Sequence, residues 1–447
     1  MVGSDQTRIQ PYPDNPFYWQ YQGKPILLLG GSVEDNLFQI PALEAHLDLL
    51  ASAGGNYVRC TMSSRDEGNV WPFERDQETG LYDLTKPSRL YWDRFAHFLE
   101  LTAQRDIIAQ FEMWDRFDFT RAEWQDNPYN PKNNLNYTAR ESGLKTEILT
   151  HPGRCENDFF HTVPKLKNNT LLLQYQQAQV DQMLSLSLKY GHVLYCMDNE
   201  TNDSPEWSWY WASYIREKAH GVGVDVEMTE MWDAWDLLSG QHRHTFDRPD
   251  LFSFVDISQN NHRPTRSHWN NAQTVRKRLR LAKQAKPMNS VKIYGANSGR
   301  YGSTRDAQER FWRNIFGGLA SSRFHRPPSG LGLRPIAQAH IQSMRLLTDS
   351  MHIFNCEPHN DLLTERSWNE AYCIANPGTE YAVFFPDGGD IFLDVTVLTG
   401  ASFAVRWLDI RQSQWKPLES LNAENGRIRL VTPTEEGYWA VLVQPTR

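Results

Sequence analysis

A glutamate follows a short apolar run near the middle of the chain. Residues 193–197 are predicted to form a strand, and Asp198, Asn199 and Glu200 come directly after it. In barrels of parallel strands, the carboxyl ends of the strands carry the catalytic groups. Partial burial raises the pKa of a glutamate, so Glu200 could protonate a leaving oxygen while Asn199 orients it or a ligand hydroxyl. Alternatively, Glu200 is a structural partner for the positive end of the following helix.

Further carboxylates follow two other predicted strands. Glu112 and Asp115 come at the end of the third strand, and Glu230 and Asp233 at the end of the fifth. We favour Glu230 and Asp115 as the second carboxylate beside Glu200, although each could instead pair with a nearby arginine. A separation of roughly 6.5 to 9.5 Å from Glu200 would leave room for a water and predict inversion, whereas roughly 5.5 Å would predict retention.

Cationic and aromatic side chains gather at the same strand ends. Guanidinium groups bind carboxylate or sulfate in a bidentate manner, so this set predicts an anionic, uronate-bearing or sulfated carbohydrate. The 16 Trp and 18 Tyr also suit sugar rings, although large cores could account for them. Alternatively, the arginines pair with barrel aspartates. The candidate substrate-binding residues are Trp114, Arg116, His262, Arg263, Lys292, Tyr294, Arg323 and His325.

Composition excludes several other functions. A net charge of −8 argues against a nucleic-acid partner, and no apolar run approaches the roughly 18 residues that a membrane span needs. The five cysteines include no CxxC pair, the histidines lack metal-ligand spacing, and phosphate-loop and Gly-x-Ser-x-Gly patterns are missing. We therefore expect no cofactor and no metal. The oligomeric state is open.

The compartment depends on the first residues. They lack the basic and apolar regions of a signal peptide, and Met1 to Ser4 resemble a cloning remnant. We expect a periplasmic or secreted protein if a signal peptide has been removed, and a cytoplasmic protein otherwise.

Short apolar runs alternate with helical patterns over most of the chain, which predicts βα units and a parallel sheet. Eight such units favour a (β/α)8 TIM barrel. The strands are expected at residues 25–30, 57–62, 107–112, 193–197, 224–229, 252–257, 290–294 and 317–323. The helices are expected at residues 40–53, 91–105, 171–189, 207–220, 272–285, 304–315 and 335–349.

Two other regions have a different pattern. Residues 371–443 alternate between apolar and polar, which predicts a small antiparallel β-sandwich with Trp407 and Trp439 facing inward. We therefore divide the chain into a barrel domain, 1–355, with a short N-terminal strand pair, and a sandwich, 356–447. The long segment 115–170 follows the third strand, and its aromatic residues are expected to form a wall of the site.

Both ends of the chain resemble a known family. The segment from Asp14 to Gly31, DNPFYWQYQGKPILLLGG, resembles the start of the apiosidase-like glycoside hydrolase barrels. The stretch from Tyr381 to Val443 is similar to the small sandwich that accompanies those barrels and is named for collagen binding, although nothing here suggests collagen as a ligand. The resemblance implies a clan A type of glycosidase, in which Asn-Glu at the fourth strand end matches Asn199 and Glu200.

The sequence departs from that family at the seventh strand. The segment KPMNSVKIYG from Lys286 to Gly295 places Lys292 where the family has a nucleophilic glutamate. Either another strand supplies the second carboxylate, or water attacks directly, or catalysis is lost. We therefore expect a glycosidase that degrades a plant, algal or microbial polysaccharide or oligosaccharide with Glu200 as general acid. The alternatives are a catalytically silent carbohydrate-binding barrel and, less favoured, elimination by Lys292 or Tyr294.

Overall fold

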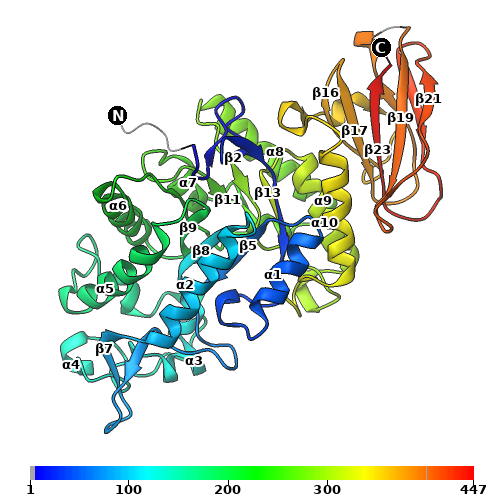
Figure 1. The fold of residues 1–447 in the computed structure, drawn as a ribbon. Helices are drawn as coiled ribbons and strands as arrows, with labels where there is room; N and C mark the ends of the chain where they lie inside the picture. Colours follow the sequence, from blue (N-terminus) through cyan, green and yellow to red (C-terminus); the bar gives the residue numbers. More distant parts are fainter. Residues whose placement is uncertain (1–5, 399, 447) are drawn as a thin grey trace.

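Eight parallel strands form a barrel in the computed structural model, which describes residues 6–398 and 400–446 (Figure 1). Hydrogen-bonded neighbours run in the order β10-β9-β8-β5-β4-β13, and β11 pairs with β12. The barrel strands are β4 (Leu28–Gly31), β5 (Tyr57–Thr61), β8 (Ile108–Asp115), β9 (Val193–Asn199), β10 (Glu227–Thr229), β11 (Val255–Asp256), β12 (Met288–Asn289) and β13 (Ser321–Phe324). The expected barrel class is confirmed.

The ring closes at two seams that lack a regular ladder, although several backbone hydrogen bonds join the seventh and eighth segments. The amide of Ala320 donates to the carbonyl of Met288 (2.9 Å), and the amide of Ser253 donates to the carbonyl of Met228 (3.1 Å). The seventh strand, expected over residues 290–294, is regular only in β12 and continues through isolated bridges. This loosely paired seventh segment carries several of the side chains described below.

An N-terminal three-stranded sheet leads into the barrel. The strand expected over residues 25–30 is divided, because its first part belongs to this sheet and its second part to the barrel. The buried Trp19 donates from its indole nitrogen to Oδ1 of Asn289 inside the barrel (2.9 Å). The strands of this sheet are β1 (Gln10–Pro11), β2 (Trp19–Tyr21) and β3 (Lys24–Ile26).

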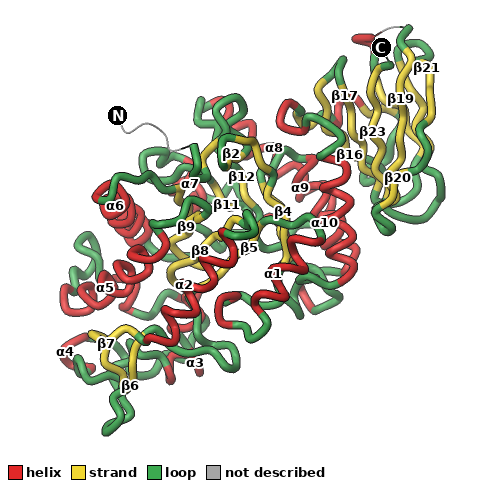
Figure 2. Tube along the Cα trace, in the orientation of Figure 1, coloured by secondary structure: helices red, strands yellow, loops and turns green. Residues whose placement is uncertain are grey.

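Helices surround the strands (Figure 2). Apolar residues at helical spacing explain this packing, since each main helix buries one face against the barrel. The main helices are α1 (Leu43–Ser52), α2 (Arg89–Ala103), α5 (Thr170–Ser187), α6 (Pro205–Gly221), α7 (Gly240–Phe246), α8 (Thr265–Leu281), α9 (Thr304–Phe316) and α10 (Pro335–Thr348).

The long segment after β8 folds mainly onto itself. Trp124, Tyr129 and Tyr137 are buried, and Phe119 stacks on Phe159 at 4.2 Å between ring centroids. Trp124, Tyr129 and Tyr137 thus build a local core and not the expected wall of the site, whereas Phe117 of the same segment lies at the cavity. The segment contains α3 (Arg121–Asp126) and α4 (Ala139–Ser142), and the hairpin β6 (Phe73–Arg75) and β7 (Tyr82–Pro87) lies beside it.

The C-terminal region consists of two antiparallel sheets, as expected. Trp407 and Trp439 lie buried in the apolar core between them, which confirms their predicted inward orientation. The larger sheet contains β14 (Glu357–Pro358), β16 (Tyr372–Asn376), β17 (Glu380–Phe385), β23 (Trp439–Pro445), β19 (Ser402–Asp409), β20 (Gln414–Trp415) and β21 (Glu419–Asn422). The smaller sheet contains β15 (Leu363–Thr364), β18 (Asp390–Asp394) and β22 (Arg427–Val431).

The larger sheet packs against the barrel through α9 and α10 (Figure 1). Every residue of α9 from Ala307 to Phe316 is buried, since the barrel covers one side and the sandwich the other. Trp312 stacks on Phe384 of β17 with 5.1 Å between ring centroids. The two parts thus share a continuous apolar core. Within the described residues, no helix is long and apolar enough to cross a membrane.

Candidate active site

A polar cavity of about 320 Å³ opens at the carboxyl end of the barrel, where barrel enzymes carry their catalytic groups. Segments that follow or end all eight barrel strands contribute to its walls. Three carboxylates, five lysine or arginine side chains and several aromatic rings line it. The lining residues are Asp35, Arg59, Arg65, Phe117, Asn199, Glu200, Asp233, Trp235, His262, Lys292, Tyr294, Arg300, Tyr301, His325, Arg326, Pro328 and Ser329.

Two extra residues after β9 position Glu200 at the cavity. Cys196 lies opposite Thr229 of β10, whereas Thr201 lies opposite Trp232, so the fourth segment is two residues longer than the fifth over this stretch. The insertion includes Glu200, whose φ of 60° lies in the left-handed region. This conformation costs a non-glycine residue about 1–3 kcal/mol and is typical of functional sites.

Lys292 and Tyr294 hold the Glu200 carboxylate. Lys292 Nζ donates to Glu200 Oε1 at 2.6 Å, and the Tyr294 hydroxyl donates to the same oxygen at 3.0 Å. Burial alone would raise the pKa of Glu200, but the charge and hydrogen bond of Lys292 lower it to about 2. Glu200 is therefore an ionised carboxylate at neutral pH. This environment argues against the general-acid role expected from the sequence.

A buried ion network supports the base of the cavity. Arg59 of β5 donates from Nε to Glu112 (2.6 Å), from one terminal nitrogen to Asp35 (2.5 Å) and from the other to the side-chain oxygen of Asn199 (2.9 Å). The same oxygen of Asn199 accepts from Lys292. Burial would raise the pKa of Asp35, but the Arg59 charge and other nearby cations lower it well below its usual value. Asn199 is thus fixed between two cations.

Asp233 is the third carboxylate of the cavity. Asn202 Nδ2 donates to Asp233 Oδ2 at 2.9 Å, and the backbone amide of Asp233 donates to the carbonyl of Thr201 at 3.0 Å. Within the described parts of the chain, no ion pair involves Asp233. Burial, together with the charge of Glu200, raises the pKa of Asp233 to about 6. Asp233 can therefore carry a proton near neutral pH.

Four rings stack along one wall of the cavity. The ring centroids are 4.2 Å apart between Trp235 and His262, 4.5 Å between His262 and Tyr294, and 5.0 Å between Tyr294 and Tyr301. Trp235 is 37% exposed, at the outer end of the stack. Burial lowers the pKa of His262 to about 4, so its ring is neutral at neutral pH. A flat aromatic wall with polar edges suits a sugar.

Most of the cations lining the cavity are already neutralised. Arg65 pairs with Asp115 (2.5 Å), and Arg326 pairs with Asp35 (2.6 Å). The exposed Arg300 differs, because it lies over the rings of Trp235 and Tyr301 and forms no ion pair with any residue that the structure describes. Acidic neighbours thus already pair with most of the cations at the cavity. Arg300 is the side chain there that is available to an anionic ligand.

The structure divides the predicted site residues into two groups. Six of them line the cavity together: Asn199, Glu200, His262, Lys292, Tyr294 and His325. The other six do not line it: Asp115, Glu230, Trp114, Arg116, Arg263 and Arg323.

Both carboxylates favoured as partners of Glu200 are engaged elsewhere. Asp115 binds Arg65 and accepts the amide hydrogen of Phe117 at 3.1 Å. Glu230 is fully buried and accepts backbone amide hydrogens, including that of Met231 at 2.7 Å. Asp233, three residues further along, lies at the cavity instead.

The four other residues outside the cavity have structural contacts. Trp114 packs against tryptophans of α6, and Arg116 pairs with Asp198 of β9 and with Asp203. Arg323 is fully buried and donates to backbone and side-chain oxygens. Arg263 contacts the carbonyl of Trp235 (3.4 Å).

Several lining residues were missed by sequence reasoning. They include Asp35, Phe117, Trp235 and Tyr301. A signal existed for Trp235, which lies two residues after Asp233 in the segment that follows the fifth predicted strand. No comparable signal marked Phe117 or Tyr301, because short 3-10 helices, Arg116–Phe119 and Gly299–Tyr301, position them and have no repeating apolar pattern.

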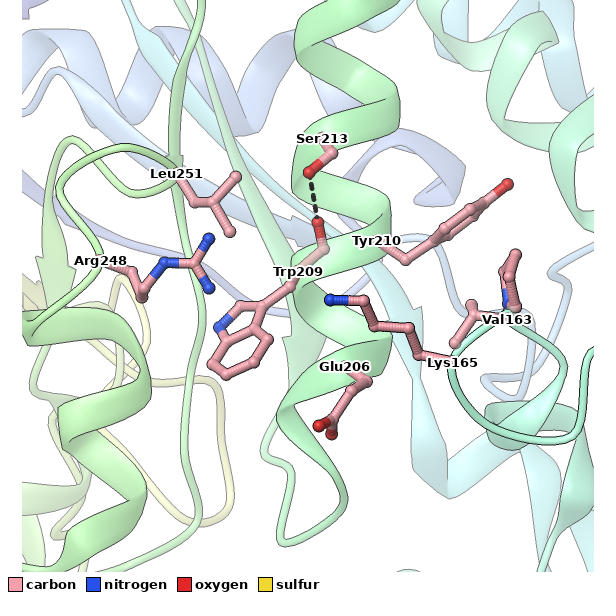
Figure 3. A pocket seen from close by; sticks show the side chains of 9 residues that line it. Val163, Lys165, Glu206, Trp209, Tyr210, Ser213, Arg248 and Leu251 are labelled. Atoms are coloured by element: carbon pink, nitrogen blue, oxygen red, sulfur yellow. Dashed lines mark hydrogen bonds between the residues drawn. The ribbon is translucent and has the colours of Figure 1, made fainter.

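A second cavity, of about 270 Å³, lies on the outside of the barrel beside α6 (Figure 3). Trp209, Tyr210 and Glu206 of α6 line it with Lys165 and Arg248. Glu206 is the one carboxylate among its lining residues, so this cavity does not supply the pair of carboxylates that glycoside cleavage needs. Within the described residues, no cluster of three or more histidine, cysteine or acidic side chains could hold a metal ion.

Comparison with known proteins supports the fold. No family model and no curated protein matches the sequence. A glycoside hydrolase family 5 structure from Bacteroides vulgatus aligns with a TM-score of 0.65 and 12% identity over 99% of this chain and 95% of that one. A second structure, described as a glycoside hydrolase, aligns with a TM-score of 0.63 and 11% identity over 99% of this chain and 98% of that one. The barrel and sandwich together therefore have the fold of glycoside hydrolase structures.

Proposed function

We propose that the protein is a glycoside hydrolase in which Glu200 attacks the anomeric carbon of a carbohydrate. The observation that carries this proposal is the placement of Glu200, an ionised carboxylate held in a left-handed backbone conformation at the cavity. Enzymes that cleave glycosides need one ionised carboxylate and one proton donor beside the scissile bond. The fold shared with glycoside hydrolase structures is consistent with this chemistry.

The low pKa of Glu200 favours a nucleophile over a base. A carboxylate with a pKa of about 2 is too weak a base to deprotonate water efficiently at neutral pH. The same property makes it a good leaving group from a glycosyl ester. Glu200 therefore forms the ester as the glycosidic bond breaks, and water then releases the sugar with retained configuration.

The cavity walls favour a sugar with an anionic substituent. The stacked rings ending at Trp235 offer an apolar face, and Arg300 beside them has a free guanidinium group for a carboxylate or sulfate. An anionic plant, algal or microbial polysaccharide or oligosaccharide is the substrate class that fits both features. The apiosidase-like subtype and the compartment stay predictions from the sequence.

One observation favours a second candidate function, a silent carbohydrate-binding barrel. Lys292 stands at the seventh segment where related barrels have a carboxylate, and it neutralises Glu200. In that case the cavity would bind an anionic sugar without cleaving it. Measurable cleavage of a glycoside would distinguish the hydrolase from the silent barrel.

The test is a screen of the wild type and Glu200→Gln against anionic oligosaccharides and aryl glycosides, uronides included. The wild type should cleave at least one substrate, and Glu200→Gln should lose about 10⁴-fold or more of that activity while binding persists. Glu217→Gln, an exposed change on α6, is the matched control and should be unaffected. Binding without any turnover would support the silent barrel. Equal activity in Glu200→Gln would refute the assignment of Glu200.

A further inference from the structure

We propose that Asp233 is the proton donor of this site, so that the two reacting carboxylates follow the fourth and fifth barrel strands. The inference rests on the proposed glycosidase function and adds the second group that the reaction requires. It also explains how a barrel with Lys292 at the seventh strand could still catalyse hydrolysis.

Backbone hydrogen bonds fix Asp233 beside Glu200. The amide of Thr201 donates to the carbonyl of Met231 at 3.0 Å, and the amide of Asp233 donates to the carbonyl of Thr201 at 3.0 Å. The fourth and fifth segments therefore stay paired past Glu200 and as far as Asp233. Glu200 and Asp233 are held on one short ladder, with both side chains at the same cavity.

The partners of the three cavity carboxylates differ. Asp35 is bound by arginines, and Glu200 is bound by Lys292. The hydrogen-bond donor to Asp233 is the neutral amide of Asn202. A contacting cation stabilises the ionised form of a carboxyl group, so Asp233 is the cavity carboxyl best able to hold a proton.

The charges around Asp233 also couple it to Glu200. Burial and the negative charge of Glu200 raise the pKa of Asp233, and the positive charges of Lys292 and Arg300 oppose them. When Glu200 becomes a neutral ester, the pKa of Asp233 must fall. Asp233 would then be ionised when water has to be deprotonated for the second step.

The reaction has two steps, formation of the glycosyl ester and its hydrolysis. The Asp233 carboxyl transfers its proton to the glycosidic oxygen, and the C1–O bond breaks with its electron pair on that oxygen, which leaves as an alcohol. A Glu200 carboxylate oxygen forms the new bond to C1. In the second step, Asp233 removes a proton from water as the water oxygen displaces Glu200 from C1.

The experiment compares Asp233→Asn with the wild type on two substrates of one sugar. One is an unactivated oligosaccharide that the wild type cleaves, and the other is its 2,4-dinitrophenyl glycoside, whose leaving group needs no proton. Cleavage of the oligosaccharide should fall about 10²–10⁴-fold, whereas formation of the enzyme ester from the aryl glycoside should fall less than about tenfold. Azide should speed release of the trapped sugar as a glycosyl azide.

Asp236→Asn, an exposed change three residues away, is the control and should resemble the wild type. Equal losses on both substrates, or wild-type cleavage of the oligosaccharide by Asp233→Asn, would overturn the proposal while leaving the function intact. Absence of turnover by the wild type would instead refute the proposed function.

The pKa of Asp233 can also be measured without any substrate. Titration of the Asp233 carboxyl carbon by NMR, assigned by its loss in Asp233→Asn, should give a midpoint near pH 6. The midpoint should move lower in Glu200→Gln. A midpoint near the ordinary aspartate value in both proteins would overturn the proposal.

Discussion

The barrel mouth buries ions, whereas the core of the C-terminal sandwich buries apolar and aromatic side chains. Arg59 and Glu112 are fully buried beneath the cavity, and Lys292 is nearly so. Between the sandwich sheets, the core is built of residues such as Trp407 and Trp439. Buried ion pairs are expensive to desolvate and often add nothing to stability, while apolar burial stabilises directly. This difference is what we expect if the mouth carries out the proposed chemistry and the sandwich adds stability.

Among the substitutions that test this contrast between mouth and sandwich, Lys292→Met should have the largest effect. The change leaves the Glu200 charge, whose side chain is 16% exposed, without its cation, which costs at most about 3–5 kcal/mol of unfolding free energy unless the carboxyl takes up a proton. The pKa of Glu200 should rise, because burial then acts unopposed. Activity should fall by about 100-fold or more, and its acid limb should move to higher pH. Chemical unfolding and pH–rate profiles measure both effects, with the exposed Lys277→Met as control.

Next in size is Trp407→Ala in the sandwich. Removing a buried tryptophan should cost about 3–5 kcal/mol, through lost apolar burial and the cavity left behind. The kcat of the folded fraction should not change, because the cavity lies in the barrel. Trp368→Ala, at a 46% exposed position, should cost much less. A large loss of kcat in folded Trp407→Ala would break the contrast between the two regions.

Asp233→Asn should make the protein more stable at high pH. The folded pKa of Asp233 is raised to about 6, so its protonated form favours folding below the unfolded value near 3.8, and this contribution is lost as pH rises through 6. Above pH 7 the wild type therefore bears the cost of a buried charge. The variant should gain about 1–3 kcal/mol at pH 8 and almost nothing at pH 4. Equal unfolding free energies at pH 8 would contradict the raised pKa.

The smallest effect is expected for Arg300→Ala. Because Arg300 is exposed, losing its contact with an anionic substituent should raise KM about tenfold for charged substrates and leave neutral ones unchanged. Added salt should weaken binding of charged substrates in the wild type and have less effect in the variant. The exposed Arg243→Ala is the control. Equal effects on neutral and charged substrates would refute the anionic class.

Periodicity was sufficient to predict the barrel, the sandwich and the position of Glu200, because these depend on repeating apolar patterns and on strand ends. Periodicity could not decide whether Glu230 or Asp233 lies at the cavity. The regular part of β10 ends at Thr229, and beyond it the direction of each side chain depends on irregular backbone paired with the fourth segment. The low pKa of Glu200 could not be predicted either, because Lys292, which lowers it, is 92 residues away in sequence.

The central claim is that Glu200 attacks the anomeric carbon. The most direct test is mass spectrometry of Asp233→Asn quenched during turnover of a 2,4-dinitrophenyl glycoside that the wild type accepts. The account predicts a sugar ester on the peptide that contains Glu200, together with product of retained configuration by NMR. An ester on another residue, or inverted product without any ester, would contradict it.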